Sequence, residues 1–493
     1  MDTASPTYRL PLPGDDAATV LAELARIVGS RHVTCDPDIV SPWLIDWRGR
    51  YTGRALAMVS PANTGELAAV VALCARHGVP IATQGGNSGM VGGATPDGSG
   101  TQLLLSTRRL TSLRIDPDTA TAECGAGVVL QNLHTAAAEH GLRFPLSLGG
   151  KGSATVGGLV STNAGGTQVL RHGTMRALVL GVEAVLPDGR TLNTVNGLRK
   201  DNRGFDLKQL FIGSEGTLGI VTRAALKLVP AVRERQTAWI GLPGLREARR
   251  LLLLCEERLG SALEGFEVLP QSCLDHVIDY LPGARSPLAD RHAWHALIEC
   301  VGSGRQEGAL SDLVRECLAE AMEQGLIHDA ALATNEAQAE AFWALREAIS
   351  PAEKARGPAV QHDIAVAPDA MPDLVERLGE LVEARFPGHG VAAFGHLGDG
   401  NVHFHVVAPL CAAEDWSLTV ARDISILVYD TVTQHGGTIS AEHGIGQDKL
   451  DTLARTMDPV ALDLMRAVKH AVDPAGLLNP GKLVPLAPVG ARP

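Results

Sequence analysis

The sequence predicts a protein of mixed helices and strands that is divided into two or three domains. Its 493 residues are too many for one ordinary hydrophobic core. Apolar residues follow helical spacing in some segments and strand-like runs in others. Glycine-rich segments are concentrated before Pro230, whereas amphipathic helical patterns dominate after it. We therefore expect a domain boundary near residue 230.

Composition and charge exclude several classes of protein. The net charge of −12, without a dense Lys/Arg block, argues against a nucleic-acid or anionic-membrane partner. The eight cysteines are scattered, and no pair has C-x-x-C spacing, so we expect reduced thiols without an iron–sulfur or cysteine–zinc site. No signal peptide is visible, and the longest apolar run, Leu251–Cys255, is too short to cross a membrane. These features predict a cytoplasmic enzyme without a transmembrane segment; a peripheral position at the inner face of the membrane is the alternative.

The first part of the chain predicts a helix followed by a β–α–β unit. Residues 16–29 have helical spacing and end on Gly29, which is typical of a helix C-cap. The next segments read as strand, helix and strand at residues 55–60, 64–77 and 78–83. The last strand leads directly into a glycine-rich loop.

That loop, Gln84-Gly-Gly-Asn-Ser-Gly-Met-Val-Gly-Gly93, has five glycines in ten residues. Such a segment can wrap backbone N–H groups around an anion, although a merely flexible loop has the same composition. It lacks the Gly-Lys-Ser/Thr ending of a nucleoside-triphosphatase loop and the spacing of the dinucleotide fingerprint. A second match, Gly125-Ala-Gly127, lacks the third glycine because position 130 is Leu. We interpret it as a tight strand-to-helix turn and not as a nicotinamide site.

A longer cluster, Leu148–Gly166, consists mostly of glycine, small and hydroxyl-bearing residues. Val156, Leu159 and Val160 are interleaved too regularly for a linker. Close contact of the backbone with a large flat or phosphorylated cofactor accounts for both features. Two predicted strands then frame the turn at residues 187–190, and a third glycine-punctuated block covers residues 206–222.

These three blocks, in this order, resemble the flavin-binding half of the vanillyl-alcohol-oxidase or PCMH-type flavoproteins. The likeness is greatest for the D-lactate, glycolate and D-2-hydroxyglutarate dehydrogenase branch. It implies an α+β fold with a two-subdomain PCMH-type FAD-binding domain, a cap domain whose antiparallel sheet is covered by helices, and a C-terminal segment that returns to the FAD domain. The expected divisions are an N-terminal helical segment at 1–45, the FAD domain at 46–230, the substrate or cap domain at 231–430 and the C-terminal segment at 431–493.

The resemblance also implies an FAD cofactor. Residues 84–93 contain neither His nor Cys, the residues that attach the flavin covalently in many relatives, so we expect FAD to be bound non-covalently. The Asn479-Pro-Gly turn resembles the family's closing contact to the cofactor. The FAD-binding residues implied in this way are Gly85, Gly86, Asn87, Ser88, Gly89, Leu148, Gly149, Ser153, Gly157, Gly158, Thr162, Asn163, Val182 and Asn479.

A β-hairpin with three histidines is predicted at Phe394–Val406. With Gly398-Asp-Gly-Asn401 as the turn, His396 would lie opposite His403, and His405 would share the face of His403. Directly opposed residues have Cβ atoms roughly 4.5–5.5 Å apart, close enough for two imidazoles to bind one metal ion. A hairpin with surface histidines is the alternative.

The adjacent pair Glu442-His443 supplies the groups that the hairpin lacks. Two imidazoles and a carboxylate suit Zn²⁺, with Mn²⁺ or Fe²⁺ as alternatives. In the resemblance, His396, His403 and Glu442 fall on the family's metal ligands, and His443 falls on its catalytic proton acceptor.

The resemblance also implies substrate-binding residues. Arg346 matches the family's carboxylate-binding arginine, whereas a plain helix-surface arginine would pair with Glu340 or Glu347. Ser350 and His405 are expected near the substrate. Some relatives place Asn where His405 stands, so His405 is either a substrate contact or a fourth metal ligand. Relatives commonly carry Lys at Gln361, which puts a dicarboxylate substrate in doubt.

Together these features predict an FAD-dependent, metal-assisted oxidation of a lactate-like or 2-hydroxyglutarate-like D-2-hydroxy acid to its 2-oxo acid. The metal would lower the pKa of the substrate hydroxyl, His443 would accept its proton, and the flavin would accept the hydride. The expected electron acceptor is an electron-transfer flavoprotein, a quinone or a cytochrome, and a homodimer is compatible with the resemblance. The alternatives are an O₂-using oxidase, a non-redox flavoprotein of the same fold and a metallohydrolase.

Overall fold

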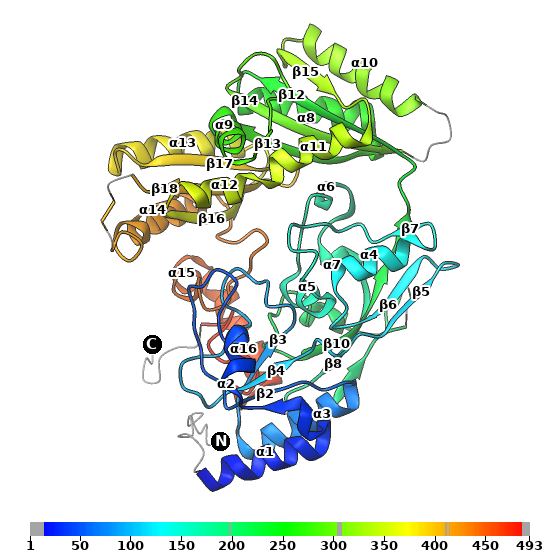
Figure 1. The fold of residues 1–493 in the computed structure, drawn as a ribbon, viewed down its shortest axis with the longest axis vertical. Coiled ribbons are helices and arrows are strands. Elements are labelled where there is room, and N and C mark those ends of the chain that lie inside the picture. Colours follow the sequence, from blue (N-terminus) through cyan, green and yellow to red (C-terminus); the bar gives the residue numbers. More distant parts are fainter. Residues whose placement is uncertain are drawn as a thin grey trace. The chain divides into compact units, whose positions relative to one another are not determined.

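The chain forms two structural units in a computed structural model that describes residues 14–196, 198, 200–302, 308–409, 412–413 and 415–485 (Figure 1). The first unit takes the chain up to Gly165, Thr174–Ala231 and the segment from Glu442 onward. The second unit takes Gly166–Gly173 and Val232–Ala441. No helix among the described residues has the length and apolar character that crossing a membrane requires.

Two sheets form the framework of the first unit. The smaller has the order β1-β2-β4-β3, with parallel pairing of β2 and β3 to β4, and the larger has the antiparallel order β5-β6-β10-β8-β9. Their bounds are β1 (Val33–Thr34), β2 (Ala57–Val59), β3 (Ile81–Gln84), β4 (Leu103–Ser106), β5 (Leu113–Asp116), β6 (Thr121–Gly125), β8 (Val179–Val185), β9 (Thr191–Asn193) and β10 (Ile220–Lys227). A separate two-stranded pair joins β7 (Leu142–Arg143) to β11 (Val229–Pro230).

The smaller sheet packs against α1 (Gly14–Val28) and α3 (Thr64–His77). Apolar residues at helical spacing, such as Val20 and Leu24, are fully buried against the sheet. Asn63 caps α3 by accepting the Glu66 N–H, and Gly78 ends it in a left-handed conformation. The predicted helices at 16–29 and 64–77 are therefore confirmed. Because β1 pairs with β2, the segment expected to form a separate N-terminal region belongs to this unit.

The larger sheet has its own core, which includes α4 (Leu130–Ala138) and α5 (Val156–Thr162). The remaining short helices of the first part of the chain are η1 (Ser30–His32), α2 (Pro37–Val40), η2 (Ser41–Trp43), α6 (Val169–His172), α7 (Met175–Leu178) and η3 (Leu207–Leu210). Of these, α6 lies in the short segment that belongs to the second unit.

The C-terminal segment completes the first unit through α15 (Leu450–Thr456), α16 (Pro459–Val472) and a bridge to the smaller sheet. Leu478 forms a parallel bridge with Ile81, and the buried ammonium of Lys469 donates to the carbonyls of Thr217 and Leu478. The predicted boundary at residue 430 needs correction because it falls inside α14 (Val420–Gln434), which packs on the sheet of the second unit. The chain leaves that unit at Ala441.

The second unit is built on one antiparallel sheet with the order β15-β12-β14-β13-β17-β18-β16. The strands are β12 (Glu234–Leu242), β13 (Leu263–Pro270), β14 (Trp294–Gly302), β15 (Asp329–Leu332), β16 (Ala359–Ala365), β17 (Gly390–His396) and β18 (Asn401–Val407). The antiparallel sheet that the resemblance implied is therefore confirmed.

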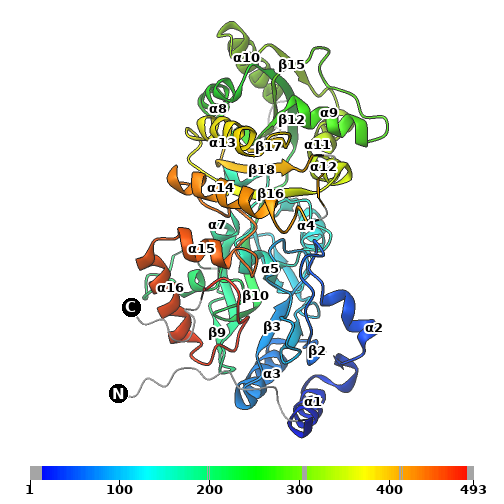
Figure 2. The same ribbon diagram turned by 90° about the vertical axis from the view of Figure 1, so that its left-hand side faces the viewer.

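Helices cover both faces of this sheet (Figure 2). One face packs against α9 (Gln271–Tyr280), α11 (Glu336–Glu347) and α12 (Ile349–Arg356), with Phe394 and Trp239 buried beneath them. The other helices are α8 (Leu245–Leu259), η4 (Gly260–Ala262), α10 (Ala309–Glu323), α13 (Met371–Arg385) and α14. The three histidines of the β17–β18 hairpin share the sheet face of Phe394.

Candidate active site

The two glycine-rich loops of the first unit meet backbone to backbone. A Cβ atom built on Gly86 would lie 1.8 Å from the carbonyl oxygen of Ser153, and one on Gly85 would lie 2.3 Å from Oγ1 of Thr155. At Gly86 no side chain fits because it would meet backbone, and at Gly85 the hydroxyl of Thr155 would have to move. Gln84 anchors the start of the first loop by donating from Nε2 to the carbonyls of Trp43 and Ala94.

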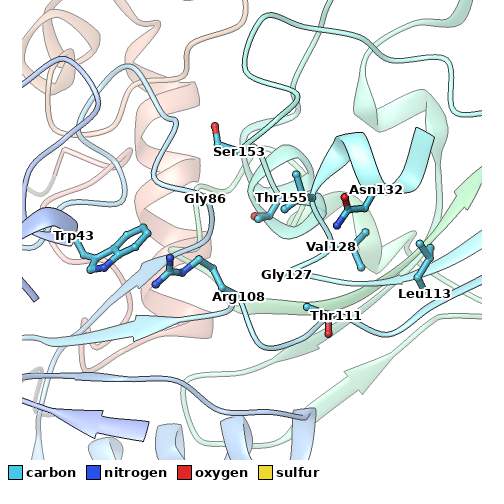
Figure 3. A pocket seen from close by; sticks show the side chains of 11 residues that line it. Trp43, Gly86, Arg108, Thr111, Leu113, Gly127, Val128, Asn132, Ser153 and Thr155 are labelled. Atoms are coloured by element: carbon cyan, nitrogen blue, oxygen red, sulfur yellow. The ribbon is translucent and has the colours of Figure 1, made fainter. Parts of the chain in front are cut away.

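A cavity of about 350 Å³ lies beside this loop contact (Figure 3). Gly86, Ser153 and Thr155 line one part of it, and Arg108 lies in its wall with the guanidinium carbon 3.3 Å from the centre of the Trp43 ring. Burial lowers the pKa of Arg108, and the indole face offers this cation a favourable partner. Oγ1 of Thr155 is buried and has no hydrogen-bond partner among the described residues. A free hydroxyl, a cation and exposed backbone suit a phosphorylated ligand.

The other predicted FAD residues of the loops lie close to this contact. Ser88 and Gly89 follow it in the first loop, and Leu148 and Gly149 begin the second. Gly157, Gly158 and Thr162 lie on α5, which starts next to Thr155. Their roles toward FAD stay predictions.

Three further predicted FAD residues have structural partners. Oδ1 of Asn163 accepts from Oγ1 of Thr174 at 3.0 Å and from the N–H of Arg176 at 2.9 Å, and therefore fixes the start of α7. Val182 is fully buried in the core of the larger sheet. Asn479 accepts the N–H of Thr83 at 2.8 Å and thereby holds the C-terminal segment beside the first glycine loop. Contact of these residues with FAD also stays a prediction.

The histidine hairpin of the second unit has a different register from the predicted one. His396 pairs with Asn401 and Phe394 pairs with His403, so the prediction that His396 lies opposite His403 is wrong. Asn401 belongs to β18 and not to the turn, because its Nδ2 donates to Oδ1 of Asp363 and to the carbonyl of Ile364. His396 and His403 are diagonal neighbours on one face, with ring centres 5.5 Å apart.

Each of the three histidines has a buried carboxylate partner. Glu267 pairs with Nδ1 of His396, and Glu353 pairs with Nδ1 of His405. Asp363 lies 3.8 Å from Nδ1 of His403. All three carboxylates are at most 1% exposed. A carboxylate on one ring nitrogen orients the imidazole and directs the other nitrogen toward a metal ion.

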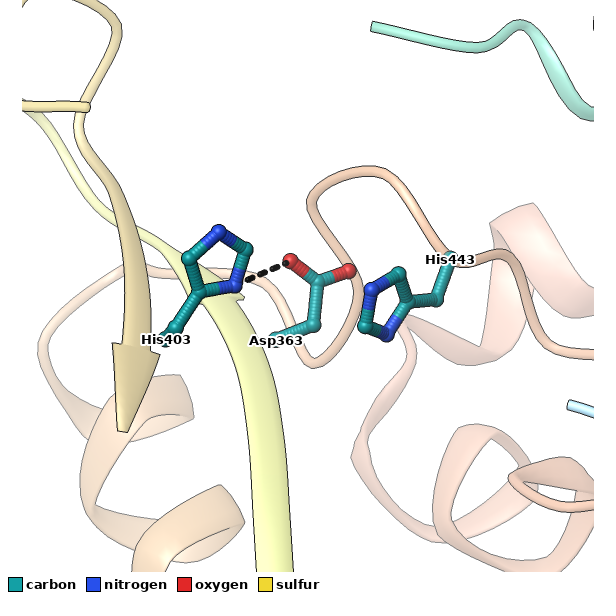
Figure 4. Close-up of side chains that lie close together, drawn as sticks. All are labelled: Asp363, His403 and His443. Atoms are coloured by element: carbon teal, nitrogen blue, oxygen red, sulfur yellow. Dashed lines mark ion pairs between the residues drawn. The ribbon is translucent and has the colours of Figure 1, made fainter. Parts of the chain in front are cut away.

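Glu442 and His443 are placed at these histidines by the chain connection through Ala441, whose N–H donates to the carbonyl of Asp363 at 3.3 Å. Two overlapping sets of three side chains have ligand atoms that all lie within 4.8 Å of one another. The sets are His396, His403 and Glu442, and Asp363, His403 and His443. Figure 4 shows the second set, with the carboxylate of Asp363 between the two imidazoles. The first set is the predicted ligand group, and its donor atoms suit a divalent ion such as Zn²⁺.

Arg346, predicted as a carboxylate-binding residue, lies on α11 beside the same hairpin. Its Nε donates to Oε2 of Glu267 at 2.9 Å, and its Nη2 lies 2.8 Å from the same oxygen as an ion pair, so Arg346 does not pair with Glu340 or Glu347 in the way expected of a surface arginine. Burial alone would raise the pKa of Glu267, but His396 and Arg346 outweigh this effect and lower it. The guanidinium carbon lies 4.9 Å from the centre of the Phe394 ring.

The remaining predicted residues differ in their surroundings. Ser350 is exposed at the start of α12. His405 is buried on Glu353 and belongs to neither potential metal set, although its role stays a prediction. Gln361 lies directly across from His405 on β16.

The sequence interpretation missed the three buried carboxylates. Glu267 is followed by two apolar residues in Glu267-Val268-Leu269, and Asp363 is followed by two apolar residues in Asp363-Ile364-Ala365. Each is the one acidic residue of its three-residue run. A lone acid in such a run is a signal for a buried and paired carboxylate. Glu353 has no comparable signal, because its neighbours on α12 are polar as well as apolar.

Comparisons with known proteins assign both units. Residues 55–194 match the FAD binding domain family, and residues 232–483 match the family of FAD linked oxidases, C-terminal domain. The chain is 38% identical over 485 residues to D-2-hydroxyglutarate dehydrogenase, mitochondrial, of Bos taurus, covering 97% of this chain and 86% of that protein. It is 34% identical over 465 residues to D-2-hydroxyglutarate dehydrogenase of Xanthomonas citri pv. viticola, covering 94% and 96%. The solved structure of p-cresol methylhydroxylase with substrate bound has a TM-score of 0.76 at 16% identity and coverage of 97% and 98%, which shows the PCMH-type fold.

Proposed function

We infer that this chain, which belongs to the family of FAD-linked oxidases, uses FAD and a divalent metal ion to oxidise a D-2-hydroxy acid to its 2-oxo acid. Family membership makes the chain an FAD-linked oxidoreductase. The observation that carries the finer proposal is the set of His396, His403 and Glu442 with Arg346 paired beside it through Glu267.

The residues of the first unit fit FAD. The loop contact at Gly86 leaves no room for a side chain, and the adjoining cavity is lined by Arg108 and by Thr155, whose buried hydroxyl has no hydrogen-bond partner among the described residues. When bound, FAD supplies a two-electron acceptor for the hydride that leaves the substrate carbon. These residues would hold its polar portion, while the cavity would exclude water from it.

The residues around the hairpin fit a divalent ion. His396, His403 and Glu442 would hold it, with Glu267 and Asp363 orienting the two imidazoles. When bound, such an ion supplies Lewis-acid polarisation of the substrate hydroxyl. Arg346 would bind the substrate carboxylate with the N–H groups that Glu267 does not occupy. His443 would accept the hydroxyl proton, since histidine exchanges a proton near neutral pH.

D-2-hydroxyglutarate is the first substrate that we propose, because relatives named for its oxidation match nearly the whole chain. A monocarboxylic, lactate-like D-2-hydroxy acid is the second candidate. It is favoured by Gln361, a neutral side chain across from His405, and by the buried carboxylate of Glu353 on that histidine. Neither group would neutralise a second substrate carboxylate.

Anaerobic mixing of the FAD-loaded protein with D- and L-2-hydroxy acids tests the proposal. We expect D-enantiomers to bleach the visible flavin absorbance, and the ratio of rates for 2-hydroxyglutarate and lactate ranks the two substrate candidates. Removal of the metal by a chelator should abolish bleaching and leave the oxidised flavin spectrum intact. If no 2-hydroxy acid bleaches the flavin, a non-redox role is favoured; a purified protein that binds no flavin would favour a metallohydrolase.

We also propose that a protein or quinone acceptor, and not O₂, reoxidises the flavin, because the relatives that match nearly the whole chain are named as dehydrogenases. Stopped-flow reoxidation of the reduced protein in air measures this directly. Reoxidation slower than turnover with an artificial acceptor supports a dehydrogenase, whereas reoxidation at the turnover rate identifies an oxidase.

A further inference from the structure

Glu267 touches two groups that the proposed reaction uses for different parts of the substrate. It lies on β13 and is 1% exposed. Its Oε1 pairs with Nδ1 of His396, a proposed metal ligand, and its Oε2 accepts from Nε of Arg346 and forms an ion pair with Nη2 of the same side chain. Nothing in the proposed reaction requires Glu267 to contact the substrate itself.

We propose that Glu267 is a positioning residue that fixes the metal ligand His396 and the carboxylate-binding Arg346 relative to each other. This inference rests on the proposed function. The inference goes beyond the proposed function because it assigns one buried carboxylate, through its two oxygen atoms, to both the metal site and the substrate-carboxylate site.

At His396 the carboxylate determines which ring nitrogen remains for a metal ion. A hydrogen bond between Nδ1–H and Oε1 fixes the tautomer with Nε2 unprotonated and sets the ring orientation. The negative charge also makes the imidazole a stronger donor to a cation. Removing the charge should therefore weaken metal binding without removing any ligand.

At Arg346 the same carboxylate occupies one edge of the guanidinium. Nε–H donates to Oε2 and Nη2 lies 2.8 Å from the same oxygen, so the Nε edge of the guanidinium faces Glu267 and the Nη1 group is left for another partner. Phe394 lies under the guanidinium plane and further limits its rotation. The remaining edge is thus held in one direction, as a fork for the substrate carboxylate.

The geometry of a 2-hydroxy acid explains why one residue should hold both groups. Its hydroxyl and carboxylate lie on adjacent carbons, so the metal and the guanidinium must keep a fixed separation to bind both ends at once. A displacement of about 1 Å in either group can cost roughly a hundredfold in rate. The two oxygens of one carboxylate are a rigid spacer of suitable size, and β13 pairs directly with β17 where Glu267 faces His396.

Glu267→Gln is the main test, because it keeps the shape of the side chain and removes its charge. We expect the FAD content of the variant to be unchanged, its affinity for Zn²⁺ to fall about 10–100-fold and its KM for the 2-hydroxy acid to rise. Zn²⁺ affinity is measured on substrate-free protein as metal content after dialysis against graded chelator. In the Co²⁺-substituted protein, a change in the visible absorption bands would report an altered ligand geometry.

Glu264→Gln is the matched control. Glu264 lies on the same strand, is also 1% exposed and pairs with an arginine, Arg171, at 2.9 Å. Its replacement removes an equally buried charge, and we expect Zn²⁺ affinity and the Co²⁺ spectrum to stay as in the wild type. Equal losses of metal in the two variants would overturn the proposal, since any buried charge on β13 would then have the same effect.

Two further variants test separately the role of Glu267 at the metal site and its role at the substrate-carboxylate site. Arg346→Lys keeps the positive charge but loses the Nε hydrogen bond and the fork of the guanidinium, so KM should rise while Zn²⁺ affinity changes little. Glu267→Asp, which shortens the side chain, serves if Glu267→Gln does not fold, and it should lower both Zn²⁺ affinity and substrate affinity. A wild-type protein that binds no divalent metal would contradict the proposed function, whereas a metal-binding wild type with an unchanged Glu267 variant would contradict only this inference.

Discussion

Some residues of the candidate site could be predicted because their residue types and their spacing in the sequence indicate their chemistry. His396, His403, Glu442 and His443 stand out as metal-binding or proton-accepting residue types next to glycine-rich turns. Glu267, the partner of His396, comes from β13, and Glu353, the partner of the neighbouring His405, comes from α12; both are far away in the sequence. Pairing of this kind depends on tertiary packing, and no local pattern encodes it.

The variant His443→Ala distinguishes the two overlapping metal sets. If His396, His403 and Glu442 hold the metal and His443 is the base, the variant keeps its Zn²⁺ and FAD and loses roughly 10²–10⁴-fold in turnover. Metal content and the rate of anaerobic flavin reduction check this result, and added imidazole should restore part of the rate. Loss of Zn²⁺ would instead identify Asp363, His403 and His443 as the ligands. Wild-type turnover would contradict the role as base.

A second residue-level prediction concerns His295, which is buried in the second unit away from the hairpin. Trp239 donates to its Nδ1 at 3.1 Å, so that nitrogen must be unprotonated, and Nε2 contacts Oε1 of Gln271 at 3.0 Å. Burial, with smaller effects from His292 and Arg291, lowers its pKa to about 4. The unfolded chain, with a His pKa of about 6.5, then binds a proton that the folded chain does not.

His295 should therefore make the protein less stable as the pH falls. Its contribution is fully present above about pH 6.5 and is lost as the pH drops from there to about 4. Thermal unfolding temperatures measured across this range should fall less steeply for His295→Gln than for the wild type. The exposed His140 provides the control, because His140→Gln should keep the wild-type slope. Parallel slopes in the wild type and His295→Gln would contradict the prediction.

At the level of helices and strands, local signals predicted elements with clear ends. The helix α3 has a capping Asn63 and a terminal Gly78, and the sequence interpretation placed both of its ends correctly. The helix α9 was not predicted: it follows β13 without a break, and its N-cap position is Pro270, the last residue of that strand, which provides no side-chain capping group. The hairpin register was wrong because Asn401 resembles a turn residue, although its side chain is bonded to β16.

The contact between the glycine loops leads to a prediction at this level. In Gly86→Ala, the new methyl group would meet the Ser153 carbonyl at 1.8 Å, so one of the two loops must move. We expect the variant to lose FAD affinity while it keeps its metal affinity, because two of the three proposed metal ligands, His396 and His403, lie in the other unit. Flavin content after gel filtration and Zn²⁺ content measure the two properties. Gly98→Ala, where no heavy atom lies within 4 Å, should keep its flavin. Full flavin content in Gly86→Ala would contradict the loop contact.

For the whole chain, the family and the fold class followed from the order of the glycine-rich blocks, and both are confirmed by the matching families and structures. The predicted domain boundaries agree only in part with the two structural units. Residues 166–173 lie in the midst of the FAD-binding part of the sequence yet belong to the second unit, where Arg171 pairs with the buried Glu264. Such a crossing leaves no change in composition, so sequence patterns do not predict it.

One buried carboxylate, that of Glu215, contributes to the return of the chain to the first unit. Glu215 accepts the N–H groups of Ile445 and Gly446, each at 2.7 Å, and its own carbonyl accepts from Nδ2 of Asn479. Burial raises its pKa, although the two N–H groups oppose this shift. Glu215 therefore ties the third glycine-rich block of the sequence to the segment that begins with Glu442 and His443.

Glu215→Gln should loosen that segment. The amide keeps the shape but turns one acceptor oxygen into a donor that faces a backbone N–H, and each buried donor left unpaired costs about 1–3 kcal/mol. We expect a lower free energy of unfolding for the first unit and a lower Zn²⁺ affinity, because Glu442 lies only three residues before Ile445. Urea unfolding followed by flavin release, together with Zn²⁺ content after dialysis, measures both effects.

The control is Glu123→Gln, which removes a partly exposed carboxylate paired with Arg114 and Arg223 in the same unit. It should leave Zn²⁺ affinity unchanged. If Glu215→Gln instead lowers stability but binds Zn²⁺ like the wild type, the placement of Glu442 does not depend on this anchor, and the hairpin alone holds the metal.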